Sequence, residues 1–399
     1  MEIPKIVGVN SPNDCNGFDI VIGNPPYIDS ETMTNNGLEW ERKLLQKTFV
    51  NLAGNWDIYM AFFELGLSLG SILSFITPDK WLSKGFGLKF RENQLRRRLS
   101  LITKAGSKVF ESATVDAIIT LFKRKSNELK AYEFTTSDII SFRSSKNVNN
   151  IDKPYLIDFM FSENSALVDK INLINSKISD YCECEGACAT SDFYVVKELI
   201  EENKNPDKDK YYKLINTGTI GKYYNKWDLK PISYDGQFNY PVVQIKKFEE
   251  KLGRTYIERA KRPKLILKGI NLLDVCLDET AEILPGKSTM VICSEDIQLL
   301  KFLMGVLNSR LPIFYIKNKY SSSSYCGGIT FTKDMINNFP LKFTKEYKEK
   351  IINLVNKILT IKEKDPQTDT TELETQIDEL VYDLYDLSSE ERNIIKNNK

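Results

Sequence analysis

Four consecutive residues, Asn24-Pro25-Pro26-Tyr27, combine a side-chain amide, two rigid prolines and a phenol ring. They directly follow the apolar run 18–22 (FDIVI), which predicts a short β-strand ending at Gly23. Because α/β domains carry their active sites at the carboxyl ends of parallel strands, this position favours a chemical role. Asn-Pro and Pro-Pro are also ordinary turn dipeptides, so the alternative interpretation is a rigid turn without chemistry.

The composition excludes several kinds of chemistry. The 399 residues include no His, which removes Ser-His-Asp and Cys-His catalysis and every imidazole metal site. The seven Cys are an odd number scattered through a long chain, which predicts a reducing cytoplasm. The run CECEGAC (182–188) lacks a second ligand pair, so we expect free thiols and no metal. No apolar run reaches the ~18 residues of a membrane span, and we expect no membrane association.

The tetrapeptide after such a strand resembles the signature of the amino-group DNA methyltransferases. The resemblance implies that the Asn24 side-chain oxygen and the Pro25 carbonyl accept hydrogen bonds from an adenine amine, localising its lone pair. The amine would then attack the methyl of the cofactor S-adenosylmethionine. Pro26 would stiffen the loop, and Tyr27 would stack on a base swung out of double-stranded DNA. Direct transfer needs no covalent nucleophile, and Asn in first place favours adenine over cytosine.

Further runs resemble landmarks of the TaqI-like and type IIG restriction–modification enzymes. In that group a Val-Phe pair supplies a second aromatic that stacks on the flipped base, and Val109-Phe110 occupies its place. An ordinary core role for Phe110 is the alternative. Asp57 and Tyr59 belong either to the site or to a helix cap and a buried aromatic. The matching runs are DIYMAF (57–62), SILSFITPDKWL (71–82), LKFR (88–91), GACATSDFYVV (186–196), RPKLILKGI (262–270), LMGVLNSRLPIFYI (303–316), GGITFTKDMINNFPL (327–341) and IDELVYDLYDLSSEE (377–391).

Charge is unevenly distributed, although the net charge is only +1. Residues 81–110 carry eight Lys/Arg and one acidic residue, and residues 241–270 carry nine Lys/Arg and three acidic residues. The segment from Asp365 onward carries ten acidic and three basic residues. Two basic blocks and an acidic end predict a surface for a polyanion such as double-stranded DNA. Solvated helix faces are the alternative. The expected DNA contacts, in a cleft between two domains, are Arg91, Lys108, Arg259, Lys261 and Arg262.

The elements around the motif predict an α/β fold. Strands at 18–22, 71–76 and 115–122 alternate with helices at 58–69 and 87–99, which favours a largely parallel, Rossmann-like sheet. We expect residues 1–150 to be the C-terminal half of a methyltransferase catalytic domain. Residues 151–399 should form an α+β target-recognition domain that ends in a helical hairpin, 344–363 and 371–386.

One expected part of such an enzyme is missing from the sequence. The resemblance implies a Gly-rich loop that binds the cofactor and lies well ahead of the Asn-Pro-Pro-Tyr motif, but only 23 residues precede Asn24. Gly85-Phe-Gly87 follows the wrong strand and predicts a plain loop. We therefore expect an incomplete sheet that is inactive alone, from a truncated frame, an excised piece or one half of a split enzyme. A non-catalytic DNA-binding remnant is the alternative.

Overall fold

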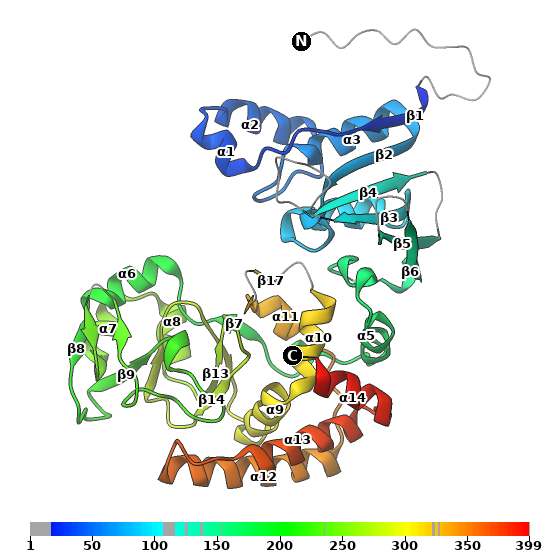
Figure 1. Ribbon diagram of the computed structural model, residues 1–399. Coiled ribbons are helices and arrows are strands. Elements are labelled where there is room, and N and C mark those ends of the chain that lie inside the picture. The colour runs from blue at the N-terminus through cyan, green and yellow to red at the C-terminus, as the bar shows by residue number, and fades with distance from the viewer. Residues whose placement is uncertain are drawn as a thin grey trace. The chain divides into compact units, whose positions relative to one another are not determined.

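The computed structural model describes residues 17–106, 116–123, 127–135, 139–151, 153–234, 236–320, 324–325 and 328–398. The chain divides into two compact units (Figure 1). Unit 1 extends to Ala166 and includes Asn318–Ser322, and unit 2 comprises Leu167–Lys317 and Ser323–Lys399. The division therefore falls later in the chain than residue 150.

Unit 1 is built on a six-stranded sheet of order β1-β2-β4-β3-β5-β6. Of its strands, β1, β2 and β4 correspond to the three that the sequence predicts. The strands are β1 (Phe18–Gly23), β2 (Gly70–Pro78), β3 (Leu99–Gly106), β4 (Ala117–Phe122), β5 (Glu128–Phe134) and β6 (Ile140–Asn147).

The prediction of a largely parallel sheet is wrong. Only the pairs β1–β2 and β3–β5 are parallel, whereas β4 runs antiparallel to both of its neighbours and β6 antiparallel to β5. The short connections between strands explain the antiparallel pairs β3–β4 and β5–β6, because a parallel crossover needs about a dozen residues or more. Residues 107–116 between β3 and β4, and 135–139 between β5 and β6, are too short for one. Strand β6 (Ile140–Asn147) ends just before the expected domain boundary at residue 150.

Helices Tyr59–Leu69 and Leu88–Gln94 pack on one face of this sheet. The predicted helix at 58–69 is α3, and the predicted helix at 87–99 ends early because Leu99 begins β3. Phe63 of α3 lies at the centre of an aromatic cluster with Phe75, Trp81, Phe90 and Phe122, at ring distances of 5.0–5.7 Å. The helices are α1 (Ser30–Asn35), α2 (Glu39–Thr48), α3 (Tyr59–Leu69) and α4 (Leu88–Gln94), with 3-10 turns at Asp79–Leu82 and Gly85–Gly87.

The opposite face of the sheet is open near β1. Phe18, Ile20 and Ile22 alternate along this strand on one face, and they are 52%, 55% and 78% exposed. Ile72 and Ile76 of β2 continue the same face and are half-buried. Among the described residues, β2 is the only strand that pairs with β1, so the outer edge of β1 is unpaired. β1 therefore presents an apolar face and an edge that no described strand covers.

Unit 2 contains two four-stranded sheets of order β15-β9-β12-β8 and β14-β13-β16-β7. The predicted strands at 211–215 and 264–267 are β9 and β13. Helices α6, α7 and α8 pack on the first sheet around Phe248. The elements are β7 (Cys184–Gly186), α6 (Thr190–Glu198), β8 (Ile200–Glu202), β9 (Tyr211–Ile215), β12 (Pro241–Gln244), α7 (Ile245–Lys251), α8 (Arg254–Ala260), β13 (Lys264–Lys268), β14 (Val275–Asp278), β15 (Ile283–Pro285) and β16 (Thr289–Cys293); β10 (Ile232–Ser233) pairs with β11 (Gln237–Phe238), and β17 (Ser324–Tyr325) with β18 (Gly328–Ile329).

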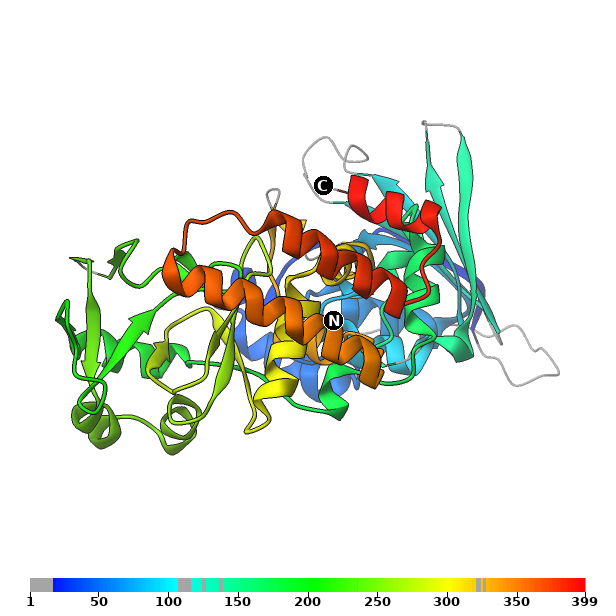
Figure 2. The same ribbon diagram turned by 90° about the horizontal axis from the view of Figure 1, so that it is seen from below.

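A helical part completes unit 2. The predicted hairpin is present as α12 and α13, which lie side by side (Figures 1 and 2). Thr344 accepts the Tyr347 amide as the N-cap of α12, and Asp296 caps α9 in the same way. The sequence analysis missed α14, although Ser388 and Glu391 form its capping box. The helices are α5 (Ser165–Asn172), α9 (Ile297–Asn308), α10 (Arg310–Lys319), α11 (Lys333–Asn337), α12 (Lys345–Lys364), α13 (Thr371–Leu384) and α14 (Ser389–Asn397).

Within the described ranges, no single helix is both long enough and apolar enough to cross a bilayer. Only α9 and α10 taken together reach that length and apolarity, and they are bent by 62°.

Candidate active site at the end of strand β1

The Asn-Pro-Pro-Tyr loop leaves the sheet at the carboxyl end of β1, beside the parallel strand β2. Gly23, the last residue of β1, pairs with Phe75, and a Cβ at this position would lie 2.9 Å from the Phe75 ring. The chain therefore needs glycine to pass this close to β2. Asn24 is exposed, Pro25 is buried and Tyr27 is half-buried. The predicted position of the motif, at the end of a strand with a parallel neighbour, agrees with the structure.

The two functional side chains of the loop contact each other. The Tyr27 hydroxyl lies 2.9 Å from Asn24 Oδ1 and 3.2 Å from the carbonyl oxygen of Ile76 on β2, and it can donate its proton to either acceptor. The Tyr27 ring packs edge-on against Tyr59, with centroids 6.3 Å apart. Burial and the nearby Asp57 carboxylate raise the pKa of Tyr27, so the hydroxyl keeps its proton. Asn24 Oδ1 has a second lone pair, so it can accept a further donor beside this hydroxyl.

Asp57 contacts the motif directly. Its Oδ1 accepts the backbone N–H of Ile28, directly after the motif, at 3.0 Å. The Tyr59 backbone N–H also acts to lower the pKa of this carboxyl, although the N-cap of α3 is Ile58, without a side-chain cap hydrogen bond. Burial outweighs these hydrogen bonds and raises the pKa of Asp57 to about 6. Tyr59 is a fully buried aromatic that supports Tyr27.

A second buried carboxyl, Asp79, follows the end of β2. Burial and the nearby Asp116 carboxylate raise its pKa to about 6. Burial raises the pKa of Tyr59 well above its usual value. Electrostatic interactions with the nearby Asp57, Asp79 and Tyr27 raise it further. The sequence analysis did not single out Asp79, since an acid after a Thr-Pro pair is an ordinary start of a helical turn.

The predicted second stacking residue, Phe110, lies outside the described residues, as do Val109 and Lys108. The structure therefore does not place a partner for Tyr27 on the far side of a base. The roles expected for these residues stay predictions.

Arg91 does not lie on a surface, which corrects its expected role as a DNA contact. Its side chain is 1% exposed, and its guanidinium donates to the carbonyl oxygens of Trp81, Lys84 and Pro154. Burial lowers the pKa of Arg91 to about 10. Three donated bonds to loop carbonyls make Arg91 a structural tie within unit 1 rather than a phosphate ligand.

Three predicted DNA contacts, Arg259, Lys261 and Arg262, lie in unit 2, and each has an acidic partner. Arg259 of α8 donates to both oxygens of Glu185 and, at 2.8 Å, to the Gly186 carbonyl, so it ties α8 to β7. Lys261 pairs with Glu249 at 2.6 Å, and Arg262 with Glu295 at 3.1 Å. The last two side chains are about half exposed, so their ion pairs are weak and can exchange for other anions.

Three other features carry less chemistry. A Cβ on Gly87 would lie 2.3 Å from the Trp81 carbonyl, so Gly85-Phe-Gly87 packs against its own unit. The described residues contain no group of three metal-ligand side chains, and burial raises the pKa of the Cys182, Cys184 and Cys188 thiols.

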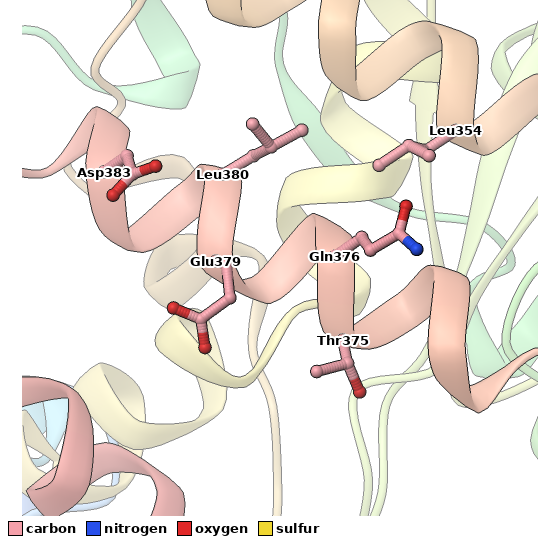
Figure 3. A pocket seen from close by; sticks show the side chains of 6 residues that line it. All are labelled: Leu354, Thr375, Gln376, Glu379, Leu380 and Asp383. Carbon is pink, nitrogen blue, oxygen red and sulfur yellow. The ribbon is translucent and has the colours of Figure 1, made fainter.

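A hollow of about 340 Å³ between α12 and α13 is lined by Leu354, Thr375, Gln376, Glu379, Leu380 and Asp383 (Figure 3). Arg392 forms salt bridges with the two acidic residues of this hollow, Glu379 and Asp383.

Comparisons with known proteins address the motif segment directly. Residues 2–110 match the family model described as the Eco57I restriction-modification methylase. The resemblance to restriction–modification methyltransferases is confirmed. A curated relative, the type II restriction enzyme and methyltransferase RM.Eco57I of Escherichia coli, is 23% identical over 203 residues, which cover 47% of this chain and 20% of the relative. The methylase match thus contains Asn24 and Tyr27, and the chain spans about a fifth of that relative.

Two solved structures are similar to the chain outside as well as inside the methylase segment. The Type IIL restriction-modification enzyme MmeI, solved in complex with DNA, has a TM-score of 0.54 at 13% identity, over 95% of this chain and 57% of its own. The type IIG restriction endonuclease BpuSI has a TM-score of 0.33 at 12% identity. The match covers 92% of this chain and 54% of that one. The likeness to MmeI supports a shared fold and, at this identity, nothing further.

The motif loop places two acceptor groups, the Asn24 side-chain oxygen and the Pro25 carbonyl, beside the Tyr27 ring. The Gly85–Gly87 turn, which precedes α4, is closed by the Trp81 carbonyl and cannot cradle a cofactor. We therefore find no fit for S-adenosylmethionine at this turn.

Proposed function

We propose that this chain is the amine-binding part of a site-specific DNA methyltransferase that modifies adenine N6 in a restriction–modification system. The observation that carries the proposal is the Asn24–Tyr27 pair at the carboxyl end of β1, within the segment that matches a restriction–modification methylase. Carbonyl acceptors and an aromatic ring suit an amine, and the described residues of this loop include no activated nucleophile.

The role of each loop residue follows from its chemistry. Asn24 Oδ1 and the Pro25 carbonyl would accept the two N–H bonds of the adenine amine, beside the Tyr27 hydroxyl. The amine lone pair would then withdraw from the ring and become available for attack. The Tyr27 ring, held edge-on by Tyr59, would stack on a base swung out of the duplex.

The methyl donor would be S-adenosylmethionine, which supplies an electrophilic sulfonium methyl when bound. We propose that a further methyltransferase segment holds it and docks along β1. The unpaired edge of β1 and its exposed Phe18, Ile20 and Ile22 support this. Such a segment would be part of a longer chain or a separate subunit.

Double-stranded DNA is the proposed partner of the complete enzyme. MmeI was solved in complex with DNA, and Lys261 and Arg262 offer half-exposed charges that can exchange their acids for phosphates. Recognition of a specific sequence would belong to unit 2, and adenine would be read at the Asn24 loop.

The test is methyl transfer to DNA by the chain supplied with its cofactor-binding segment. Labelled methyl groups should appear as N6-methyladenine after DNA digestion, and Asn24→Ala should lower the rate on the order of 10²–10³-fold. Asn35→Ala, which changes an exposed Asn of α1, is the matched control and should be neutral. Full activity in Asn24→Ala would exclude this loop as the methyl-transfer site.

The alternative is a non-catalytic DNA-binding protein. It is favoured by the half-exposed charges of Lys261 and Arg262, which could bind phosphates with or without a methyl donor. This alternative predicts salt-sensitive DNA binding without methyl transfer under any reconstitution, so the same assay separates the two.

A further inference from the structure

The backbone of the Asn24–Tyr27 loop has few hydrogen-bond donors of its own. Pro25 and Pro26 carry no backbone N–H. After them, the Ile28 amide donates to a side-chain acceptor, the Asp57 carboxylate. A loop that must aim Asn24 and Tyr27 at a base therefore depends on what holds Ile28.

Two successive residues hold Ile28 from both sides. Asp57 Oδ1 accepts the Ile28 N–H at 3.0 Å, and the Ile58 N–H donates to the Ile28 carbonyl at 2.9 Å. The next residue, Tyr59, carries the Tyr27 ring edge-on. Residues 57–59, at the start of α3, thus fix both the backbone after the motif and the ring within it.

Within this clamp, the Asp57 side chain is the one that accepts the Ile28 amide. We propose that Asp57 is a positioning residue of the methyl-transfer site, whose carboxylate holds the Asn24–Tyr27 loop in place through the Ile28 amide. The role in methyl transfer rests on the proposed function, whereas the clamp itself does not. A neutral carboxamide at this position keeps an acceptor oxygen, and a methyl group does not.

The surroundings of Asp57 make the clamp sensitive to pH. The titratable and charged groups that face it are Tyr27, Asp29, Tyr59 and Lys80. Burial raises the pKa of Asp57 to about 6, and the acid form is a weaker acceptor than the carboxylate. Asp29 is exposed, and the Thr32 backbone amide lowers its pKa, so it titrates well below this range. The bond to Ile28 should weaken as the pH falls below about 6.

Selective labelling can isolate this one amide. In the whole chain, ¹³C′-Tyr with ¹⁵N-Ile labels only three peptide bonds, those of Ile28, Ile257 and Ile316. Ile257 and Ile316 lie within α8 and α10 and serve as internal controls. The Ile28 cross-peak should shift with a midpoint near pH 6, and the two controls should not.

Two variants decide the assignment. Asp57→Asn should abolish the titration and keep the Ile28 peak near its high-pH position, and Asp57→Ala should move it upfield at every pH. An Ile28 peak that does not titrate in the parent would overturn the proposal. A titration that persists in Asp57→Asn would also overturn it, because the signal would then come from Asp79.

Methyl transfer by the reconstituted enzyme tests the role of the clamp. Asp57→Ala should lower kcat about tenfold with DNA affinity unchanged, and Asp57→Asn should restore the rate and remove its decline below pH 6. An unchanged kcat in Asp57→Ala would overturn the positioning role. A parent that transfers no methyl group contradicts the proposed function instead, and the Ile28 titration still decides whether the clamp exists.

Discussion

At the scale of single residues, the site depends on one hydroxyl and one amide. Tyr27 reaches Asn24 Oδ1 in the structure, so the acceptor proposed for the adenine amine already has a donor. This contact orients Asn24 without substrate, and the second lone pair of Oδ1 can accept the amine. The hydroxyl and the ring of Tyr27 therefore have separate roles, and substitutions can separate them.

Tyr27→Phe should have a mild effect on methyl transfer, because the ring survives and Asn24 loses only one donor. Tyr27→Trp should also be mild. Tyr27→Ala should weaken binding of the flipped base by ~1–3 kcal/mol, the usual scale for one stacking partner. Fluorescence of 2-aminopurine placed at the target base measures this. A loss in Tyr27→Phe as large as that in Tyr27→Ala would mean that the hydroxyl, not the ring, holds the base.

Phe110→Ala should produce a similar loss in the same assay if Phe110 is the second stacking partner that the sequence predicts. If Phe110 is a core residue, the variant should instead lower the thermal stability of the protein and leave the fluorescence of the stable fraction unchanged. Thermal unfolding followed by circular dichroism separates the two results.

At the scale of elements, the site is where β1, β2 and α3 end or begin. Asp57 and Asp79 lie at these ends, and both are carboxyls whose pKa burial raises to about 6. A raised pKa means that the folded protein binds a proton more tightly than the unfolded chain does. Stability is therefore lost as the pH rises from about 4 to 6 and stays lower above that range.

Asp79→Asn should therefore stabilise the protein above pH 6, by roughly 2–3 kcal/mol, and have little effect at pH 4. Thermal unfolding at pH 4 and pH 8 tests this. Asp29→Asn is the control, because the pKa of Asp29 is lowered and its replacement should not raise Tm at pH 8. Equal effects of Asp79→Asn at both pH values would contradict the buried-charge explanation.

The basic segment around α8 makes a different prediction for DNA binding. Lys261→Ala with Arg262→Ala should weaken binding to all sequences alike and flatten the salt dependence, by about 0.9 in log–log slope per lost phosphate contact. Arg259→Ala should chiefly destabilise unit 2, because Arg259 ties α8 to β7. Affinities measured across a salt series test both, and an unchanged slope in the double variant would place the DNA elsewhere.

At the scale of the whole molecule, unit 1 exposes an apolar surface that an isolated domain rarely leaves uncovered. Phe18, Ile20 and Ile22 lie on an edge strand, where both side chains and backbone are available for pairing. We expect the chain alone to bind a hydrophobic dye and to self-associate. The docking of a cofactor-binding segment should suppress both.

Ile22→Lys should reduce dye binding and shift sedimentation toward the monomer, because a charge on the edge of a sheet opposes pairing. Leu173→Lys is the matched control, since Leu173 is 79% exposed but lies in unit 2. A parent chain that binds no dye and sediments as a strict monomer would contradict the docking surface.

The sequence by itself determined the features that depend on local pattern. The strand before Asn24, the buried helix α3 and the hairpin α12–α13 follow from apolar periodicity, and Thr344 and Asp296 mark helix starts that the structure confirms. The resemblance of the Asn-Pro-Pro-Tyr segment to methyltransferases also needed only neighbouring residues.

Only the tertiary structure decided the features that depend on distant partners. Connection length and pairing made β4 antiparallel, and strands β3, β5 and β6 became recognisable only through their neighbours. Arg91 could be a surface cation by its type, but three loop carbonyls in the interior bind it. Likewise, Asp57 meets Ile28 across 29 positions of the chain. Burial and hydrogen-bond partners are properties of packed neighbours, and a linear pattern does not contain them.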